Sequence, residues 1–293
     1  MKKVLVAGST GYLGRFVVIA LKASGYWVRA LGRSEARLEP IKRYADEVFV
    51  GEVTDPDSLT GVCDGIDFVF SSVGITRQKD GLTYKDVDYQ ANRNLLTAAE
   101  VSGVSRFVYV HVLNANKMKH VAAVRAKQAF VDELERSAVD RTVICPTGFF
   151  SDMEEFVAMA RKGQVYLFGE GTNRINPIHG ADLAEACVAA LDGQKQRLDV
   201  GGPQTFTYRE IAEMAFDVLD QPSKISCVPR GVVFAMVGLM RWVTPVKVYG
   251  PIEFMANVMT MDVVGEPCGT RRLADHFRDL IKADSLQGHS FQF

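Results

Sequence analysis

Short apolar runs alternate with segments of helical spacing through the first half of the chain. The run Val4 to Ala7 is typical of a buried strand, and Phe16 to Leu21 lies in a segment with helical periodicity. Further strands are predicted at residues 26–31, 47–50, 66–70, 106–111 and 142–145. Strands separated by helical segments at this interval indicate βαβ units. The chain is therefore predicted to be an α/β protein with a doubly wound parallel sheet covered by helices on both faces.

Two helices are predicted between the third and fifth of these strands. Residues 54–59 have the pattern of a helix start, with Asp55 as the N-cap and Pro56 at the first helical position. A long amphipathic helix is predicted from Tyr84 to Ser102, after a polar, loop-like segment at residues 74–81.

The alternation loosens from about Phe149 onward. Helices are predicted near residues 152–162 and 208–219, strands at 165–168 and 197–200, and a polar tail at the end. We expect residues 1–150 to form the dinucleotide-binding core. We expect residues 151–293 to complete that core and to form a small substrate or partner lobe, near the carboxyl ends of the parallel strands, where ligands bind in open α/β sheets.

Two apolar segments stand out in the second half, at residues 232–243 and 252–261. The first is apolar nearly all round, which predicts a helix buried on most sides. It would then be the core of the small lobe. The alternatives are the lining of a pocket for a bulky apolar substrate, a contact with a second copy or a protein partner, and a contact with a membrane surface.

Charge and cysteine content limit the expected partners, the kinds of structural site and the compartment. The 34 basic and 35 acidic side chains give a net charge of −1, so nucleic acid or an anionic membrane is not expected as the main partner. The five cysteines are scattered and form no C-x-x-C pair, which argues against structural zinc and a disulfide framework. Met1-Lys2-Lys3 runs directly into the first strand without a signal peptide, and the longest apolar run, 231–240, is too short to span a bilayer. A reducing cytoplasm is the expected compartment.

A glycine-rich turn joins the first strand to the first helix. Gly8 would permit a tight turn, Gly11 a close approach of a ligand, and Gly14 close packing of the helix on the strand. Backbone N–H groups at the start of such a helix can bind a pyrophosphate. The turn therefore predicts nucleotide binding by the whole segment, namely Gly8, Ser9, Thr10, Gly11, Tyr12, Leu13 and Gly14.

The end of the second strand bears on the choice of cofactor. NAD-binding relatives of this arrangement carry a carboxylate there for the ribose 2′-OH, whereas this chain has Arg33 and Ser34. A guanidinium suits a 2′-phosphate, because it can donate two charge-assisted hydrogen bonds. Glu35 could reach the ribose after a small shift of register. The residues favour NADP(H) over NAD(H).

The G-x-x-G-x-x-G spacing resembles the extended and atypical branches of the short-chain dehydrogenase/reductase superfamily, which have a Rossmann-type fold. The resemblance implies that Thr54 borders the adenine. It also implies that the loop of Ser72, Val73 and Gly74 follows the ribose and pyrophosphate, and that Pro146, Thr147, Gly148 and Phe149 flank the nicotinamide.

The similarity extends over about residues 1–220 through the Pro177–Ala184 and Gly201–Pro203 motifs. The pattern is most similar to the divinyl chlorophyllide a 8-vinyl-reductase-like group, because of Val87–Ala91 and Arg125–Lys127. NmrA-like proteins and an accessory subunit of respiratory complex I belong to the same resemblance. These motifs identify the branch and leave the substrate open.

The catalytic motif of ordinary members is incomplete here. They carry Tyr-x-x-x-Lys on the helix after the fifth strand, with both side chains on one face. Lys127 matches the lysine, but Ala123 stands at the tyrosine position, and the usual serine is absent around Tyr109 and His111. The Ser-Tyr-Lys mechanism therefore does not carry over.

Two functions remain open. In the first, an NADP(H)-dependent reductase acts on a small or medium apolar molecule. Lys127 holds the nicotinamide ribose or supplies a proton, with His111, His120 or Tyr109 assisting. In the second, the protein keeps the dinucleotide without catalysis and serves as a redox sensor or an assembly or regulatory protein that acts through a partner. Epimerase or lyase chemistry ranks last, since it ordinarily needs the missing tyrosine.

Overall fold

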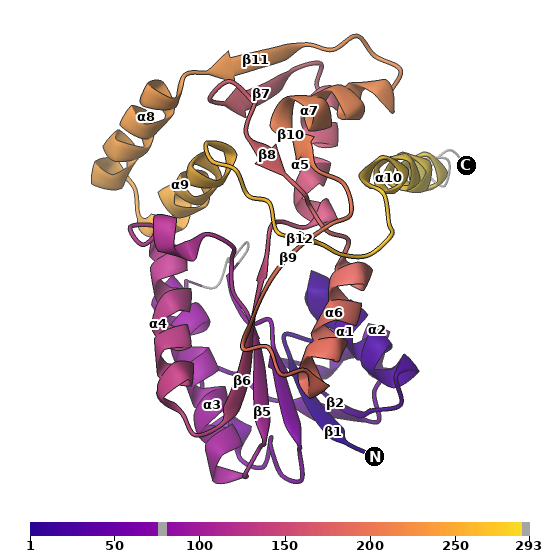
Figure 1. Ribbon diagram of the computed structural model, residues 1–293, viewed down its shortest axis with the longest axis vertical. Helices are drawn as coiled ribbons and strands as arrows, with labels where there is room; N and C mark the ends of the chain where they lie inside the picture. Colours follow the sequence, from indigo (N-terminus) through magenta and orange to yellow (C-terminus); the bar gives the residue numbers. More distant parts are fainter. Residues whose placement is uncertain (76–80, 289–293) are drawn as a thin grey trace. The chain divides into compact units, whose positions relative to one another are not determined.

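The computed structural model describes residues 1–75 and 81–288, and contains an eight-stranded sheet (Figure 1). The strand order is β12-β9-β6-β5-β4-β1-β2-β3, and the strand pairs along β1 to β6 are parallel. The predicted doubly wound parallel sheet is confirmed. The chain divides into two compact units, one of residues 1–145 and 183–199 and the other of residues 146–182 and 200–293.

The first unit holds the centre of the sheet. Val4 to Ala7 of β1 are completely buried, as their unbroken apolar run predicts for a central parallel strand. Helices α3 and α4 lie on one side of the sheet, and α1, α2 and α6 lie on the other (Figure 1). The strands are β1 (Lys3–Ala7), β2 (Trp27–Gly32), β3 (Glu47–Val50), β4 (Phe68–Ser71), β5 (Arg106–Val110) and β6 (Asp140–Pro146). The helices are α1 (Tyr12–Ala23), α2 (Glu35–Lys42), α3 (Asn92–Val101), α4 (Ala122–Arg136) and α6 (Gly180–Asp192), with 3-10 turns at η1 (Asp57–Leu59) and η3 (Ala115–Lys117).

The predicted helix start at residues 54–59 is only the short 3-10 turn η1. Asp55 Oδ1 accepts a hydrogen bond from the Asp57 backbone N at 3.2 Å, but the helical turn ends at Leu59. The turn is held in place by Leu59, whose side chain is buried. It is too short to cover the sheet as a helix would.

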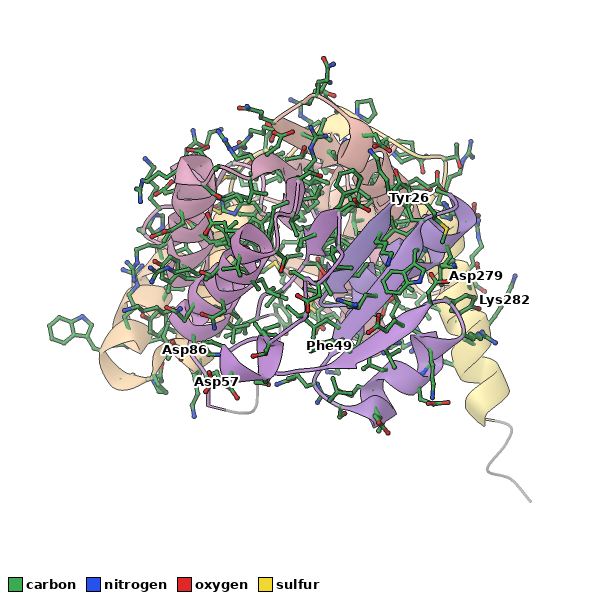
Figure 2. All side chains as sticks on the ribbon, turned by 90° about the horizontal axis from the view of Figure 1, so that it is seen from below. Tyr26, Phe49, Asp57, Asp86, Asp279 and Lys282 are labelled. Carbon is green, nitrogen blue, oxygen red and sulfur yellow. The ribbon has the colours of Figure 1, made fainter. Side chains whose placement is uncertain are left out.

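The long helix predicted over residues 84–102 begins with a π-helical segment, η2 (Lys85–Ala91), which continues into α3. Near its start, Asp86 accepts hydrogen bonds from the backbone N and the hydroxyl of Thr83 at 2.8 and 2.7 Å. Asp86 and Asp57 both lie at the outer edge of this part of the molecule (Figure 2). Asp88, two residues further, is fully buried. The wider π-helical turn thus carries an inward carboxylate close to an outward one.

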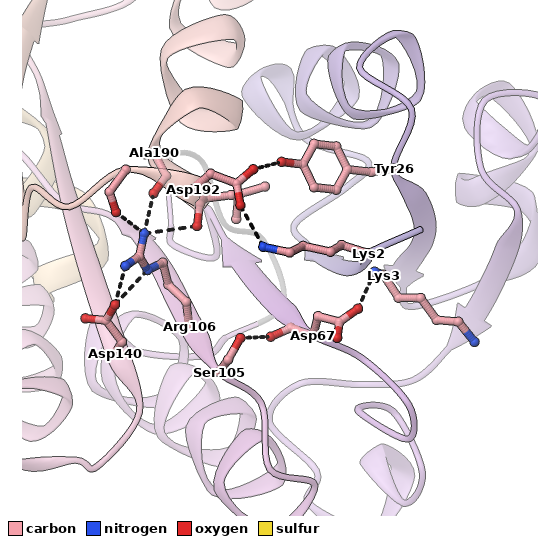
Figure 3. A network of polar contacts seen from close by, with 11 residues as sticks. Lys2, Lys3, Tyr26, Asp67, Ser105, Arg106, Asp140, Ala190 and Asp192 are labelled. Atoms are coloured by element: carbon pink, nitrogen blue, oxygen red, sulfur yellow. Dashed lines mark hydrogen bonds and ion pairs between the residues drawn. The ribbon is translucent and has the colours of Figure 1, made fainter.

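The amino edge of the sheet is closed by charged groups from distant parts of the first unit (Figure 3). Lys2 Nζ lies 2.8 Å from Asp192 Oδ1, and the Tyr26 hydroxyl donates to the same carboxylate. Arg106 pairs with Asp140 and donates to the carbonyl of Leu191 at 3.0 Å. Leu191 and Asp192 are the last residues of α6. These contacts therefore attach the end of that helix to the starts of β1, β2 and β5, which lie much earlier in the sequence.

The second unit contains shorter strands and the remaining helices. Thr207 caps α7, since its hydroxyl accepts from the Glu210 backbone N at 3.2 Å while Glu210 accepts from the Thr207 backbone N at 2.7 Å. Its elements are α5 (Phe150–Arg161), β7 (Val165–Phe168), β8 (Arg174–Ile175), β10 (Phe206–Thr207), α7 (Tyr208–Asp217), β11 (Ile225–Val228), α8 (Arg230–Val243), α9 (Val246–Met259), β12 (Glu266–Pro267) and α10 (Leu273–Gly288), and β9 (Arg197–Gly201) continues into it.

Two expectations for this region are wrong. The polar tail after residue 261 contains α10, whose Leu273 and Phe277 are completely buried. The segment 232–243 is helical as predicted, but only Val233 and Val237 of α8 are buried. A helix with apolar residues on every side is therefore not necessarily buried on every side. No helix in the described ranges is both long and apolar enough to cross a membrane.

Candidate dinucleotide and lysine site

The turn between β1 and α1 has a backbone that only glycine accommodates without strain. Gly8 has φ +80°, and a Cβ there would lie 2.8 Å from Ser72 Oγ. A Cβ on Gly14 would lie 2.0 Å from the Gly8 carbonyl oxygen. The Gly11 backbone N donates to that same oxygen at 2.9 Å. The three glycines therefore form one compact turn, as their spacing predicts.

The N-terminus of α1 suits an anion. Within the described residues, no side chain caps it and its first turn holds no acidic residue, so its N–H groups and the positive end of the helix dipole are available. Ser9 has a structural task instead, because its buried hydroxyl donates to the Leu31 carbonyl at 2.7 Å. Thr10 accepts from Arg15 Nε through its carbonyl at 2.9 Å, Tyr12 contacts Phe16 edge-on, and Leu13 is buried. The turn fits a pyrophosphate through its backbone.

Arg33 directly follows β2, and Ser34 is the N-cap of α2. The Arg33 side chain is 43% exposed, and its Nε lies 4.0 Å from Glu52 Oε2. The Thr54 backbone N donates to the other oxygen of Glu52 at 3.3 Å. The structure therefore brings Arg33, Glu52 and Thr54 together. The carboxylate of Glu52 partly neutralises the guanidinium, and the sequence reasoning did not anticipate that contact.

Lys127 of α4 lies against η2 and the loop after β4, and its side chain is 16% exposed. Its Nζ is 3.1 Å from Oδ1 of the fully buried Asp88, whose Oδ2 accepts from the Ile75 backbone N at 3.2 Å. A Cβ on Gly74 would lie 2.6 Å from Lys127 Nζ and 2.7 Å from Asp88 Oδ1. Glycine at position 74 thus lets the loop backbone approach the ion pair directly.

Tyr109 is the third member of this cluster. Its ring centroid lies 5.4 Å from Lys127 Nζ and 4.6 Å from the centroid of Phe130, and the side chain is completely buried. Burial raises the pKa of Tyr109 to about 12, although the charge of Lys127 opposes the shift. The phenol is thus neutral at pH 7 and completely buried, and Ala123 stands in α4 at the usual tyrosine position.

The lysine is held in its charged form. Burial alone would lower the pKa of Lys127, but Tyr109 and Asp88 outweigh burial and raise it. Burial raises the pKa of Asp88, against the pull of Lys127 and the hydrogen bond from Ile75. An ammonium with a raised pKa is a weak acid and a durable positive charge, so Lys127 is better suited to binding and electrostatic stabilisation than to giving up a proton.

His111 follows β5 and is 2% exposed. Its Nε2 lies 3.1 Å from Gln128 Oε1, and Gln128 Nε2 donates to Asp132 at 2.9 Å, so this network assigns the imidazole proton to Nε2. His111 Nδ1 has no hydrogen-bond partner among the described residues. Burial first, and then the charge of Lys127, lower the pKa of His111 to about 4. At neutral pH this histidine is therefore neutral, and it presents an acceptor rather than an acid.

Asp88 and Asn92 are the residues of this site that sequence reasoning did not assign. Asn92 is completely buried and accepts from the Ser71 hydroxyl at 2.6 Å. Its amide also donates to the Val73 carbonyl at 3.2 Å. It therefore fixes the loop that carries Ser72, Val73 and Gly74. The signal was available, because Asp88 and Asn92 are polar side chains at the spacing of one helix face.

The predicted nicotinamide segment, Pro146 to Phe149, lies in the second unit. The Thr147 hydroxyl donates to the Asn176 carbonyl at 2.6 Å, and the Gly148 carbonyl accepts from the Ile178 backbone N at 2.8 Å. The Phe149 backbone N donates to Asp152 Oδ2 at 3.1 Å. These three hydrogen bonds hold the segment in place. The Thr147 hydroxyl, the Gly148 carbonyl and the Phe149 backbone N therefore already have protein partners.

Comparisons with known proteins agree with the glycine turn and the sheet. A family model of NAD(P)H-binding proteins matches residues 8–194. Photosystem II assembly factor Ycf39 of Guillardia theta is 27% identical over 251 residues, which cover 83% of this chain and 79% of that protein. Divinyl chlorophyllide a 8-vinyl-reductase of Zea mays is 31% identical over 258 residues, which cover 81% of this chain and 64% of the reductase.

A solved structure of NADPH-dependent quinone oxidoreductase QOR2 from Escherichia coli, complexed with NADPH, has the same fold. Its TM-score to this chain is 0.74 at 17% identity, with 96% of this chain and 100% of that chain covered.

Proposed function

The chain belongs to the NAD(P)H-binding family, and from that premise we propose that it is an NADP(H)-dependent reductase of a small or medium apolar molecule. The observation that carries the proposal is the buried Lys127–Asp88 pair against Gly74. An ion pair removed from water costs desolvation free energy, and replacing it with apolar residues is often neutral or stabilising. An ion pair with perturbed pKa values beside the loop of Ser72 to Gly74 is therefore a candidate functional group.

The proposed cofactor contacts are those assigned from the sequence. Gly8 to Gly14 and the start of α1 would bind the pyrophosphate. Arg33 and Ser34 would bind the 2′-phosphate, with Thr54 near the adenine, and Ser72 to Gly74 would follow the ribose. Pro146 to Phe149 would flank the nicotinamide. The bound cofactor would supply the hydride for reduction.

Lys127 would act as a fixed charge. With its pKa raised, it would hold the ribose hydroxyls and stabilise negative charge that develops on the substrate during hydride transfer. His111, neutral at pH 7, would accept a hydrogen bond through Nδ1. The proton that completes the reduction would then come from water.

The preference for NADP(H) over NAD(H) is tested by calorimetric titration of NADPH, NADP⁺, NADH and NAD⁺ side by side. We expect the phosphorylated pair to bind more tightly, and Arg33→Ala to reduce that preference by about tenfold, since a charge-assisted hydrogen bond contributes about 1.5–3 kcal/mol and Glu52 offsets part of it. Glu52→Gln is the matched variant, expected to increase the preference. Equal affinity for all four dinucleotides would contradict the assignment of Arg33.

Catalysis is tested by NADPH consumption with a panel of enones, quinones and vinyl compounds. The double variant Asp88→Asn/Lys127→Met removes the charge of the pair without leaving a buried ion. We expect it to bind NADPH within about tenfold of wild type and to lose most turnover. Wild-type turnover in this variant would exclude a catalytic role for Lys127.

A second function is favoured by Ala123, which stands at the usual tyrosine position of α4, and by the complete burial of Tyr109. In this alternative the protein binds the dinucleotide and acts through a protein partner, as an assembly factor or redox sensor. Tight binding of one oxidation state, with no NADPH consumption across the whole panel, is the result that would favour it.

A further inference from the structure

Helix α8 exposes a continuous apolar stripe. Val232, Met236, Leu239 and Val243 are 57%, 43%, 67% and 71% exposed. At 100° per residue these four side chains fall within about 60° of the helix circumference. Trp242, next to the stripe, is 90% exposed. Scattered exposed apolar residues are normal on a protein surface, but a contiguous stripe with a free indole indicates an interaction surface.

A second side of α8 is firmly attached. Val233 and Val237 pack in a small buried cluster with Ala256 of α9, against Phe168 and Val228. Arg241 forms an ion pair with Glu253 of α9, and that carboxylate is 2% exposed. The stripe is therefore presented by a helix anchored along its inner side rather than by a loose segment.

The chain segment that contains α8 is rich in cations, and the first carboxylate after it, Glu253, is buried against Arg241. Residues 221–252 contain Lys224, Arg230, Arg241 and Lys247 and no Asp or Glu. All four cations are exposed, although Arg241 is engaged by Glu253 and Arg230 lies over the Phe234 ring. The near-zero net charge of the whole chain conceals this local excess.

We propose that α8 docks on the surface of an anionic phospholipid bilayer. The helix would lie in the interface, with the stripe toward the acyl chains, Trp242 at the level of the head groups, and Lys224, Arg230 and Lys247 near the phosphates. Exposed apolar area and nearby cations are the two contributions that hold an amphipathic helix at such an interface.

The charge distribution favours a bilayer over a second copy of the chain. In a symmetric dimer built on α8, the same cations would face each other across a two-fold axis. Glu253 compensates Arg241. Residues 221–252 contain no carboxylate for Lys224, Arg230 and Lys247, so such a contact would bring these like charges toward each other. An anionic lipid surface supplies the missing charge.

The test is co-sedimentation with vesicles of phosphatidylcholine containing about 30% phosphatidylglycerol, compared with phosphatidylcholine alone. We expect binding to the anionic vesicles only, weakening as salt rises toward 0.5 M. Leu239→Glu/Trp242→Glu should reduce the partition coefficient at least tenfold. Val101→Glu, which changes an 85% exposed side chain of α3, should leave it unchanged.

A second pair of variants separates charge from apolar area. Lys224→Gln/Lys247→Gln should reduce both the affinity for anionic vesicles and its salt dependence, because fewer charges are screened. Absence of binding, or equal binding to both vesicle types, would overturn the proposal. So would a dimer in sedimentation velocity that Leu239→Glu dissociates, since the stripe would then be an interface between copies.

Discussion

In the first unit, the amino ends of the parallel strands (the amino edge) and their carboxyl ends (the carboxyl edge) carry different kinds of ion pair. At the amino edge, Lys2 and Asp192 form an ion pair with side chains 56% and 57% exposed (Figure 3). At the carboxyl edge, Lys127 and Asp88 form a pair with side chains 16% and 0% exposed. Exposed pairs contribute little and are free to vary, whereas buried pairs are costly to form and more costly to break. The two edges therefore differ in how much stability the loss of one charged partner should cost.

The largest expected effect tests this contrast directly. Lys127→Met leaves Asp88 buried without its partner, so we expect the free energy of unfolding to fall by about 3–5 kcal/mol. Adding Asp88→Asn should recover most of that loss. Lys2→Met, the matched change at the amino edge, should cost no more than about 1 kcal/mol. Urea denaturation of the four proteins measures all these differences, and equal costs for the two lysines would remove the distinction between the edges.

The second effect is a pH dependence of stability that arises from His111 at the carboxyl edge. The pKa of His111 is lowered to about 4 in the folded protein, against 6.5 for an ordinary histidine. The unfolded chain therefore binds the proton first, and stability is lost as the pH falls below 6.5. Relative to His111→Gln, wild type should lose about 1.6 kcal/mol between pH 6.5 and 5. Parallel stability curves for the two proteins in urea titrations would show that His111 titrates normally.

The smallest effect compares a glycine at each edge. Gly8 and Gly25 have nearly the same φ, +80° and +81°, but a Cβ meets Ser72 at Gly8 and nothing within 4 Å at Gly25. The backbone strain is the same in both alanine variants. The close contact with Ser72 should therefore make Gly8→Ala less stable than Gly25→Ala by about 1 kcal/mol, at the low end for overpacking. Thermal unfolding measures this difference. NADPH titration should show weakened binding for Gly8→Ala only.

The sequence predicted the parts of this structure that depend on local patterns. Buried parallel strands are continuous apolar runs, and the glycine turn requires small residues at fixed positions, so both were recognisable. The Lys127–Asp88 pair was half predictable. Lys127 lies at a familiar spacing, and Asp88 and Asn92 share one helix face, but the sequence pattern does not show that the carboxylate of Asp88 is buried in a π-helical turn against the lysine.

Helix α8 could not have been placed from its sequence for a different reason. An apolar helix inside a lobe and an apolar helix on its surface have the same composition, and only the packing partners distinguish them. Val233 and Val237 have such partners in α9 and the neighbouring strands, whereas Leu239 and Trp242 remain exposed. The roles assigned to individual cofactor-binding residues remain predictions.

The network at the amino edge has a consequence for synthesis on the ribosome. Lys2 meets Asp192 across 190 positions of the chain, and Arg106 meets Leu191 across 85. The first unit therefore stays incomplete until residues 183–199 have left the exit tunnel, well after all six of its leading strands are made. At about 5–20 residues per second, the nascent sheet would wait several seconds with its outer strand position open. During that interval the edge of β6 is available to chaperones, and it is also where misassembly would begin.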